Sequence, residues 1–195
     1  MTKGRLEAFS DGILAVIITI MVLDLKIPSG ADLGALRSIA LVFASYVLSF
    51  VFIGIYWSNH HHLLHATRRI NGKILWANLH LMFWLSLVPF ATNWMGGNFP
   101  AEWPVAVYGF VLLMAAIAYF ILSRSLVEHD GRDSLLSEAV GKDRKGGISI
   151  VVYALAIGLA FVLPALSIAL YVLVAVMWIV PDRRIEDRVE PGPLV

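Results

Sequence analysis

Long uninterrupted runs of apolar residues constrain this chain more than any other feature of its sequence. A helix that crosses a bilayer needs about 20 consecutive apolar residues, and charged or Pro/Gly-rich stretches divide the chain into runs near that length. The last run, Ile148 to Val180, is too long for one span, and Pro164 at its middle is expected to separate two helices. We predict six transmembrane helices, over residues 6–26, 37–58, 74–93, 104–126, 147–163 and 165–181.

The composition supports lipid as the solvent for these helices. Apolar residues make up 59% of the 195 residues and charged residues 15%, against about 25% charged in soluble domains. A soluble chain of this length could not bury so much apolar surface. We therefore predict an all-α membrane protein with a single six-span domain over residues 1–195. The net charge of +1 implies no nucleic-acid partner, and the absence of cysteine excludes disulfides, thiolate metal sites and a cysteine nucleophile.

The distribution of Lys and Arg predicts which side of the membrane each end occupies. Six spans place thirteen of the fifteen basic residues on the side of both termini, and only Lys26 and Arg37 on the other side. An excess of Lys and Arg marks the cytoplasmic side. We therefore expect both termini in the cytoplasm and the chain in the cell (inner) membrane.

The first predicted helix carries carboxylates within an apolar run, and such residues are functional candidates. Asp11 lies near one boundary of the run and Asp24 near the other. At about 100° per residue, a single stripe forms within about 60° of Val16, and its other members are Gly12, Thr19, Ile20 and Leu23. Asp11 lies about 140° away. If the stripe lines a central axis, Asp11 points back into its own bundle; alternatively, the stripe faces lipid or a neighbouring helix.

Three motifs resemble those of the transmembrane protein 175 family, which comprises endolysosomal potassium channels and shorter bacterial forms. The first is Arg5-x-x-x-Phe9-Ser10-Asp11-Gly12, and the second is Tyr56-Trp57-Ser58-Asn59-His60-His61-His62. Asn78 and the later Pro89-Phe90 fit the third span of the family. The resemblance covers the first half of the chain by motif, and the second half by the number and placement of spans.

This resemblance implies a potassium-permeable homotetramer in the bilayer, with the first helix lining a central pore and no carbonyl selectivity filter. The implied constriction consists of rings of Val16, Ile20 and Leu23, with Thr19 beside them. The family more often has Ile or Leu at the first of these positions, so valine predicts a wider ring. Apolar rings gate by dewetting. Asp24 near the outer mouth either concentrates cations or is an interfacial carboxylate beside Lys26. No cofactor is expected, because K⁺ is the transported ion.

The signature residues are also expected to form a buried polar network, in which histidines of the second span hydrogen-bond Asp11. A buried carboxylate needs such partners, and the candidate set is Arg5, Phe9, Ser10, Asp11, His60, His61 and Asn78. A histidine-bound metal is disfavoured, because no Glu-x-x-His pair accompanies the six histidines. We therefore expect no metal site and no enzymatic activity.

A proton-coupled or ion-coupled secondary transporter is the alternative function. It would use Asp11 and the His60–His62 cluster. The sequence shows neither the internal repeat nor the broken helix pair that such carriers use.

Overall fold

The computed structural model describes residues 2–67, 69–130 and 144–179, and the regular structure within these ranges is helical. The helices are α1 (Lys3–Leu23), α2 (Leu33–Ser38), α3 (Ala40–His65), α4 (Gly72–Ser86), α5 (Val88–Asn98), α6 (Glu102–Asp130), α8 (Arg144–Leu159) and α9 (Pro164–Ile179). The predicted loop around residues 131–143, with its basic residues, and the chain from residue 180 onward lie outside the described residues.

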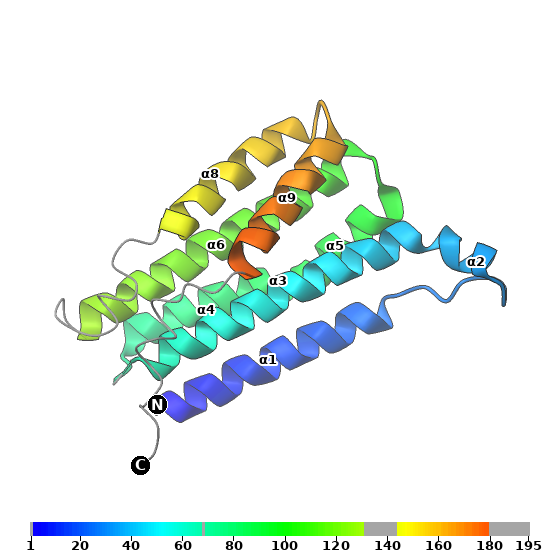
Figure 1. The fold of residues 1–195 in the computed structure, drawn as a ribbon. Helices are drawn as coiled ribbons and strands as arrows, with labels where there is room; N and C mark the ends of the chain where they lie inside the picture. Colours follow the sequence, from blue (N-terminus) through cyan, green and yellow to red (C-terminus); the bar gives the residue numbers. More distant parts are fainter. Residues whose placement is uncertain (1, 68, 131–143, 180–195) are drawn as a thin grey trace, which may run out of the picture.

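The long helices run back and forth along one bundle (Figure 1). α6 packs against α4, α5, α8 and α9, while α3 packs against α1, α5 and α9. α1 lies along one edge of the bundle, where it contacts α3, α4 and α5. The first helix is therefore held on one side and uncovered on the other.

Among the residues that the structure describes, four segments are long and apolar enough to cross a membrane: α1, α3, the pair α4–α5, and α6. α8 and α9 are apolar but shorter, at 16 residues each, or about 24 Å against a hydrocarbon core of about 30 Å. Within the described residues, each of the six predicted runs is thus mainly helical, and four of them satisfy the length and composition of a spanning helix.

Two prolines mark helix boundaries, one expected and one not. Pro164 begins α9, as the sequence predicted, because its fixed φ and missing N–H suit the first turn of a helix. The predicted span over residues 74–93 lies within one apolar segment, Gly72–Asn98, which the structure divides into α4 and α5 at Leu87. Pro89 lies two residues after that break, and its missing N–H removes the hydrogen bond that would continue α4.

Close helix contacts in the core depend on two glycines. A Cβ added to Gly109 of α6 would overlap the Tyr171 hydroxyl of α9. A Cβ on Gly96 of α5 would lie 2.9 Å from the Cα of Val42 on α3. Both contacts require the absence of a side chain, so these positions fix how closely the helices approach.

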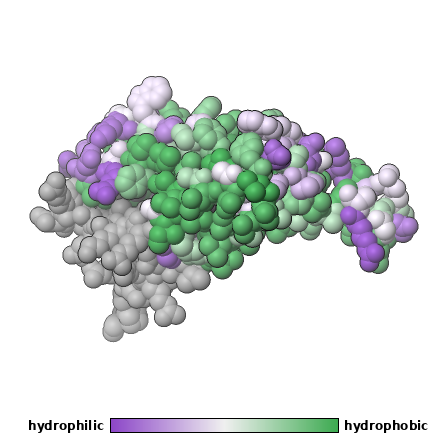
Figure 2. All heavy atoms as spheres, turned by 90° about the horizontal axis from the view of Figure 1, so that it is seen from above, coloured by the Kyte–Doolittle hydropathy of each residue, from purple (hydrophilic) through white to green (hydrophobic). Residues whose placement is uncertain are grey.

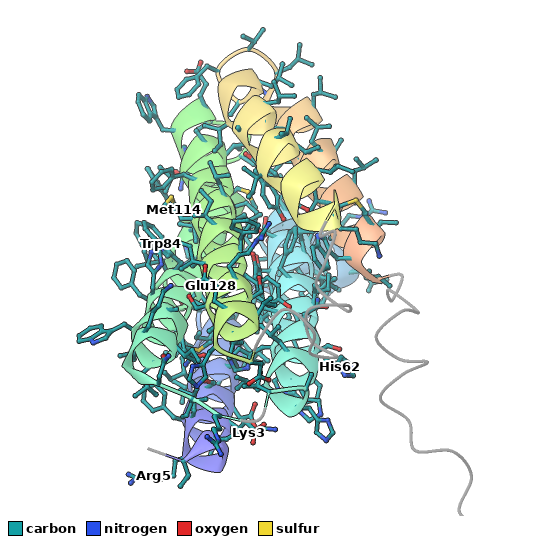
Figure 3. All side chains as sticks on the ribbon, turned by 90° about the vertical axis from the view of Figure 1, so that its left-hand side faces the viewer. Lys3, Arg5, His62, Trp84, Met114 and Glu128 are labelled. Carbon is teal, nitrogen blue, oxygen red and sulfur yellow. The ribbon has the colours of Figure 1, made fainter. Side chains whose placement is uncertain are left out.

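Polar residues gather at the ends of the bundle, and apolar residues cover the middle of the face seen in Figure 2. Lys3, Arg5 and His62 lie at the same end (Figure 3). A hydrogen bond and an ion pair connect helices at this end. The Lys3 Nζ donates to the His65 carbonyl at 3.0 Å, and Lys73 pairs with Glu128 at 2.7 Å. The α1 and α4 N-termini therefore meet the α3 and α6 C-termini, respectively.

Candidate pore helix and its polar network

α1 has one packed face and one uncovered face. Its buried residues follow helical spacing, and they are Leu6, Ser10, Leu14, Ile17 and Met21. The stripe around Val16 lies on the uncovered side: Val16 is 57% exposed, Ile20 43% and Leu23 77%. Thr19 is exposed as well. The four predicted constriction residues are thus not covered by other parts of this chain, and they can contact another molecule or line a pathway.

The Thr19 hydroxyl has a fixed orientation. It donates its hydrogen to the Ala15 carbonyl at 2.8 Å, within the same helix. A hydroxyl carries one hydrogen and two lone pairs, so the oxygen remains an acceptor toward the uncovered side. An acceptor oxygen of this kind favours a cation nearby.

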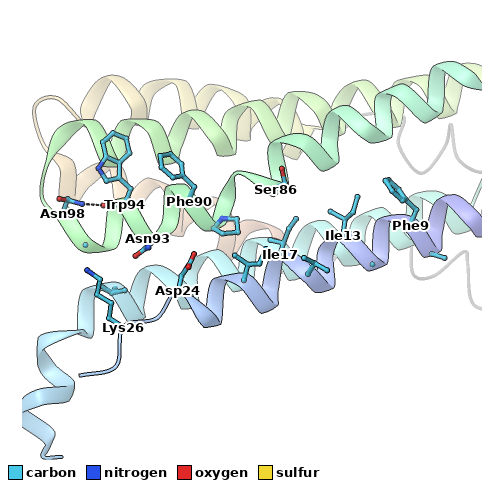
Figure 4. Close-up of a pocket in the computed structure, with 17 residues that line it drawn as sticks. Phe9, Ile13, Ile17, Asp24, Lys26, Ser86, Phe90, Asn93, Trp94 and Asn98 are labelled. Atoms are coloured by element: carbon cyan, nitrogen blue, oxygen red, sulfur yellow. Dashed lines mark hydrogen bonds between the residues drawn. The ribbon is translucent and has the colours of Figure 1, made fainter. Parts of the chain in front are cut away.

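A groove of about 1190 Å³ runs along α1 and α5 (Figure 4). Val16 and Ile20 line it from α1, and Phe90 and Trp94 line it from α5. Four polar lining residues, Asp24, Lys26, Asn93 and Asn98, gather near the C-terminus of α1, while Ser86 lines the groove farther along. The predicted mouth residue Asp24 therefore lies at the polar end of an otherwise largely apolar groove.

Three buried side chains join α1, α3 and α4. The Asn78 amide Nδ2 donates to the Ser10 Oγ at 2.9 Å, and the Asn78 Oδ1 lies 2.7 Å from the His60 Nε2. An amide oxygen can only accept, so the imidazole carries its hydrogen on Nε2. The Ser10 Oγ in turn donates to the Leu6 carbonyl at 2.9 Å. The network holds α1 in place through its signature serine.

Asp11 has a different partner from the one that we expected. The Trp57 indole N–H donates to the Asp11 Oδ1 at 3.1 Å, in an exposed pair between α1 and α3. His61 stacks on Trp57, with ring centroids 6.2 Å apart, rather than bonding Asp11. The expected histidine contact fails because His60 faces Asn78 in the core, while Asp11 lies on an exposed edge of α1.

Two other signature residues lie outside the buried network. Arg5 is exposed at the polar end of the bundle, and Phe9 is 43% exposed and lines the groove. The structure thus brings together Ser10, His60 and Asn78 and leaves Arg5, Phe9, Asp11 and His61 at the surface of the single chain.

A second buried polar cluster was missed from the sequence. The Thr92 and Ser49 hydroxyls are hydrogen-bonded at 2.6 Å, Ser49 pairs with the Tyr108 hydroxyl at 2.9 Å, and Thr92 donates its hydrogen to the Val88 carbonyl at 2.7 Å. These contacts join α3, α5 and α6. The sequence did contain a signal for this cluster, because its hydroxyl residues lie within apolar runs. A buried hydroxyl in a membrane protein needs a hydrogen-bond partner.

Histidines and carboxylates do not cluster into a closed metal centre in this part of the molecule. Over the described ranges, no group of three or more His, Cys, Asp or Glu side chains could hold a metal ion.

The fold and the pattern of exposure define a helical membrane protein whose first helix is held to α3 and α4 by hydrogen bonds of polar side chains. A sequence model of the family described as "Endosomal/lysosomal potassium channel TMEM175" matches residues 5–89. A protein of Chryseobacterium sp. (strain P1-3), named a potassium channel, is 53% identical over 97% of this chain and 99% of its own length. Another, from Streptomyces collinus and also named a potassium channel, is 31% identical over 90% of this chain and 91% of its own.

A solved structure agrees with these sequence relatives. The crystal structure of a lysosomal potassium-selective channel TMEM175 homolog from Chamaesiphon minutus matches with a TM-score of 0.78 at 26% identity, covering 91% of this chain and 96% of that one. The chain belongs to the TMEM175 family. The resemblance inferred from the motifs is therefore confirmed.

Proposed function

We propose that this chain is the subunit of a potassium-permeable cation channel. One observation carries the proposal: α1, the helix with the family signature, packs one face into the bundle and leaves its apolar stripe uncovered. The names of the Chryseobacterium and Streptomyces relatives support potassium as the ion. They give no support to the alternative of a coupled carrier.

The proposed assembly is a homotetramer with α1 of each subunit at the central axis. In that arrangement the uncovered stripes face one another, and Val16, Ile20 and Leu23 form successive apolar rings. At 1.5 Å per residue, the three rings span about 10 Å along the pore. Such rings control conduction by dewetting, and no carbonyl filter is needed.

Thr19 and Asp24 supply the polar groups of the proposed pathway. The Thr19 oxygen is an acceptor toward the stripe, because its hydrogen is donated to Ala15. Asp24 lies at the C-terminal end of α1, where a carboxylate raises the local concentration of cations. K⁺ is the permeant ion in this scheme, and no cofactor or metal takes part.

We propose that the chain lies in the cell (inner) membrane with six spans. Both termini would then be in the cytoplasm. α8 and α9 would supply the two shorter crossings, since both are apolar and pack on α6. The basic residues support this sidedness: Lys3, Arg5, Lys73 and Arg124 belong to the helix ends that meet at one end of the bundle. Lys/Arg enrichment marks the cytoplasmic side.

The buried network and the Trp57 contact would keep α1 in register with the bundle. Ser10 is tied to α3 and α4 through Asn78 and His60. A pore helix that is uncovered on one side needs such ties, because packing alone holds only half of its surface.

A flux assay tests this proposal. Purified protein in liposomes, given an outward K⁺ gradient, is expected to pass K⁺ faster than Na⁺, without a coupled ion. Because a channel lowers the barrier without a carrier cycle, single events in a planar bilayer should show discrete conductance. A flux that requires a proton gradient and saturates at carrier rates would instead support the coupled transporter.

A further inference from the structure

A small cavity lies between α3, α6, α8 and α9, with no lining residue on α1 or α5. Its volume is about 30 Å³. Aromatic and polar side chains from all four helices line it, among them Tyr56, Asn59, Tyr119, Ser149, Tyr153 and Trp178. The groove beside α1 shares none of its lining residues with this cavity. The cavity therefore lies outside the proposed ion pathway.

Two tyrosine hydroxyls at the cavity have no hydrogen-bond partner among the residues that the structure describes. Tyr153 is only 2% exposed, and Tyr56 is half-buried. The contacts of their rings are aromatic: Tyr56 packs on Tyr119, and Tyr153 packs on Phe52. Yet within the described ranges no completely sealed side-chain nitrogen or oxygen lacks a partner. The Tyr153 hydroxyl is therefore open to the cavity that the residue lines.

A hydroxyl without a partner is costly in apolar surroundings, and lipid tails offer it no hydrogen bond. A cavity of at least about 10–15 Å³ can hold a water molecule if it has two to four polar partners. This cavity has that volume, and each tyrosine hydroxyl can both donate and accept. Drug-sized ligands occupy pockets of about 300–1,000 Å³, so the volume selects water over a larger molecule.

Ser149 offers a further acceptor at the same cavity. Its Oγ donates its hydrogen to the Lys145 carbonyl at 2.8 Å and accepts from the Trp178 Nε1 at 2.8 Å. A hydroxyl has two lone pairs, so one of them is still available to a donor. Water can donate to Ser149 while it pairs with the tyrosines.

We propose that this cavity is a binding site for ordered water, which bridges the Tyr56 hydroxyl of α3 to the Tyr153 hydroxyl of α8. α8 and α9 pack on each other and on α6. The part of the chain that the structure describes contains no direct side-chain hydrogen bond between α3 and α8, although the Phe52 and Tyr153 rings are 6.4 Å apart. The water supplies the polar tie between these two helices. A bridging water is nearly as favourable as a direct hydrogen bond.

Hydroxyl-radical labelling of the purified full-length chain tests the site. X-ray radiolysis forms radicals from bound water in place, so side chains beside that water are oxidised even where bulk solvent does not reach. Tyr171 is the matched control: it is fully buried, its ring lies 6.1 Å from Tyr153, and its hydroxyl donates to the Val105 carbonyl at 3.2 Å. Mass spectrometry should show Tyr153 oxidised several-fold faster than Tyr171. Equal rates at the two tyrosines overturn the water site.

Conservative variants test the bridge. Tyr56→Phe removes one partner of the water and should lower the oxidation of Tyr153 several-fold, whereas Tyr46→Phe, the same change on α3 at a residue that does not line the cavity, should leave it at the wild-type rate. Tyr56→Phe and Tyr153→Phe together should cost less stability than the sum of the two single changes, because either one opens the same bridge. Unchanged oxidation in Tyr56→Phe, or strict additivity of the two costs, overturns the bridge.

Discussion

Replacing Asn78 with leucine tests how strongly the buried network holds the first helix. Asn78 is fully buried and joins two helices to its own: it donates to Ser10 of α1 and accepts from His60 of α3. Leucine has nearly the same shape as asparagine but neither donates nor accepts. The substitution therefore removes both hydrogen bonds with little change in packing.

The cost has two parts. Hydrogen bonds between helices in membranes contribute about 0.6 kcal/mol each, so the two bonds account for about 1 kcal/mol. The His60 Nε2–H then lacks an acceptor in a buried site, and a stranded donor costs about 1–3 kcal/mol. We expect Asn78→Leu to lower the free energy of unfolding by about 2–4 kcal/mol. The double variant with His60→Leu should cost less than the sum of the single variants, because it strands no imidazole.

Unfolding by SDS titration in mixed micelles, followed by circular dichroism, measures these differences. Asn98→Leu is the matched control, since Asn98 is exposed and its side chain bonds only the Trp94 carbonyl of its own helix among the contacts described. The control should change the free energy of unfolding by less than about 0.5 kcal/mol. A loss at Asn78 no larger than in the control, or strict additivity with His60→Leu, would refute the network as a tie between helices.

Three further predictions follow from other parts of the molecule. Val16→Asn should wet the proposed constriction, raise K⁺ flux and reduce the preference over Na⁺ in liposomes, whereas Val22→Asn, about 120° around α1, should do much less. Trp57→Phe removes one exposed hydrogen bond to α1, so it should lower the free energy of unfolding by about 1 kcal/mol or less in the same SDS titration. Gly109→Ala should cost about 1–3 kcal/mol by overpacking and lower the thermal midpoint, while Gly158→Ala in α8, with open space at its Cβ, should leave the midpoint unchanged or raise it.

The positions of the helices could be predicted from the sequence because hydrophobic run length directly reflects the bilayer. The helix ends could not. α3 continues to His65, beyond the predicted end at residue 58, because the polar histidine run remains helical past the apolar segment. α4 and α5 separate at Leu87, since the effect of Pro89 on a helix depends on whether neighbours accommodate a kink or a break.

The stripe on α1 was predictable from angles alone, because a helix fixes directions about its own axis. Its uncovered side was not, because exposure depends on where the other helices pack. Asp11 illustrates the same limit. Helical angles place it about 140° from Val16, but its side chain is exposed rather than directed into the bundle, and its partner is Trp57 rather than a histidine. Residue chemistry allowed both partners, and only the relative rotation of α1 and α3 distinguishes them.

The expected cost of removing Asp11 changes accordingly. From the sequence, a carboxylate paired in a buried network would cost about 3–5 kcal/mol to remove. The structure shows an exposed carboxylate with a neutral indole donor. The buried members of the signature network are Ser10, His60 and Asn78, so we expect their removal to cost more stability than the removal of Asp11.

The absence of cysteine makes thiol accessibility the most direct test of α1 as the pore helix. Single cysteines at Val16, Ile20 and Leu23 would be the only thiols in the chain, and Val22→Cys provides an exposed control on the same helix. A charged methanethiosulfonate reagent is expected to block K⁺ flux through at least the Leu23 and Val16 variants in liposomes and to leave the control conducting. Block of the Val22 variant with unchanged flux through the three stripe variants would contradict the account, because the stripe would then face lipid or protein rather than the permeating ion.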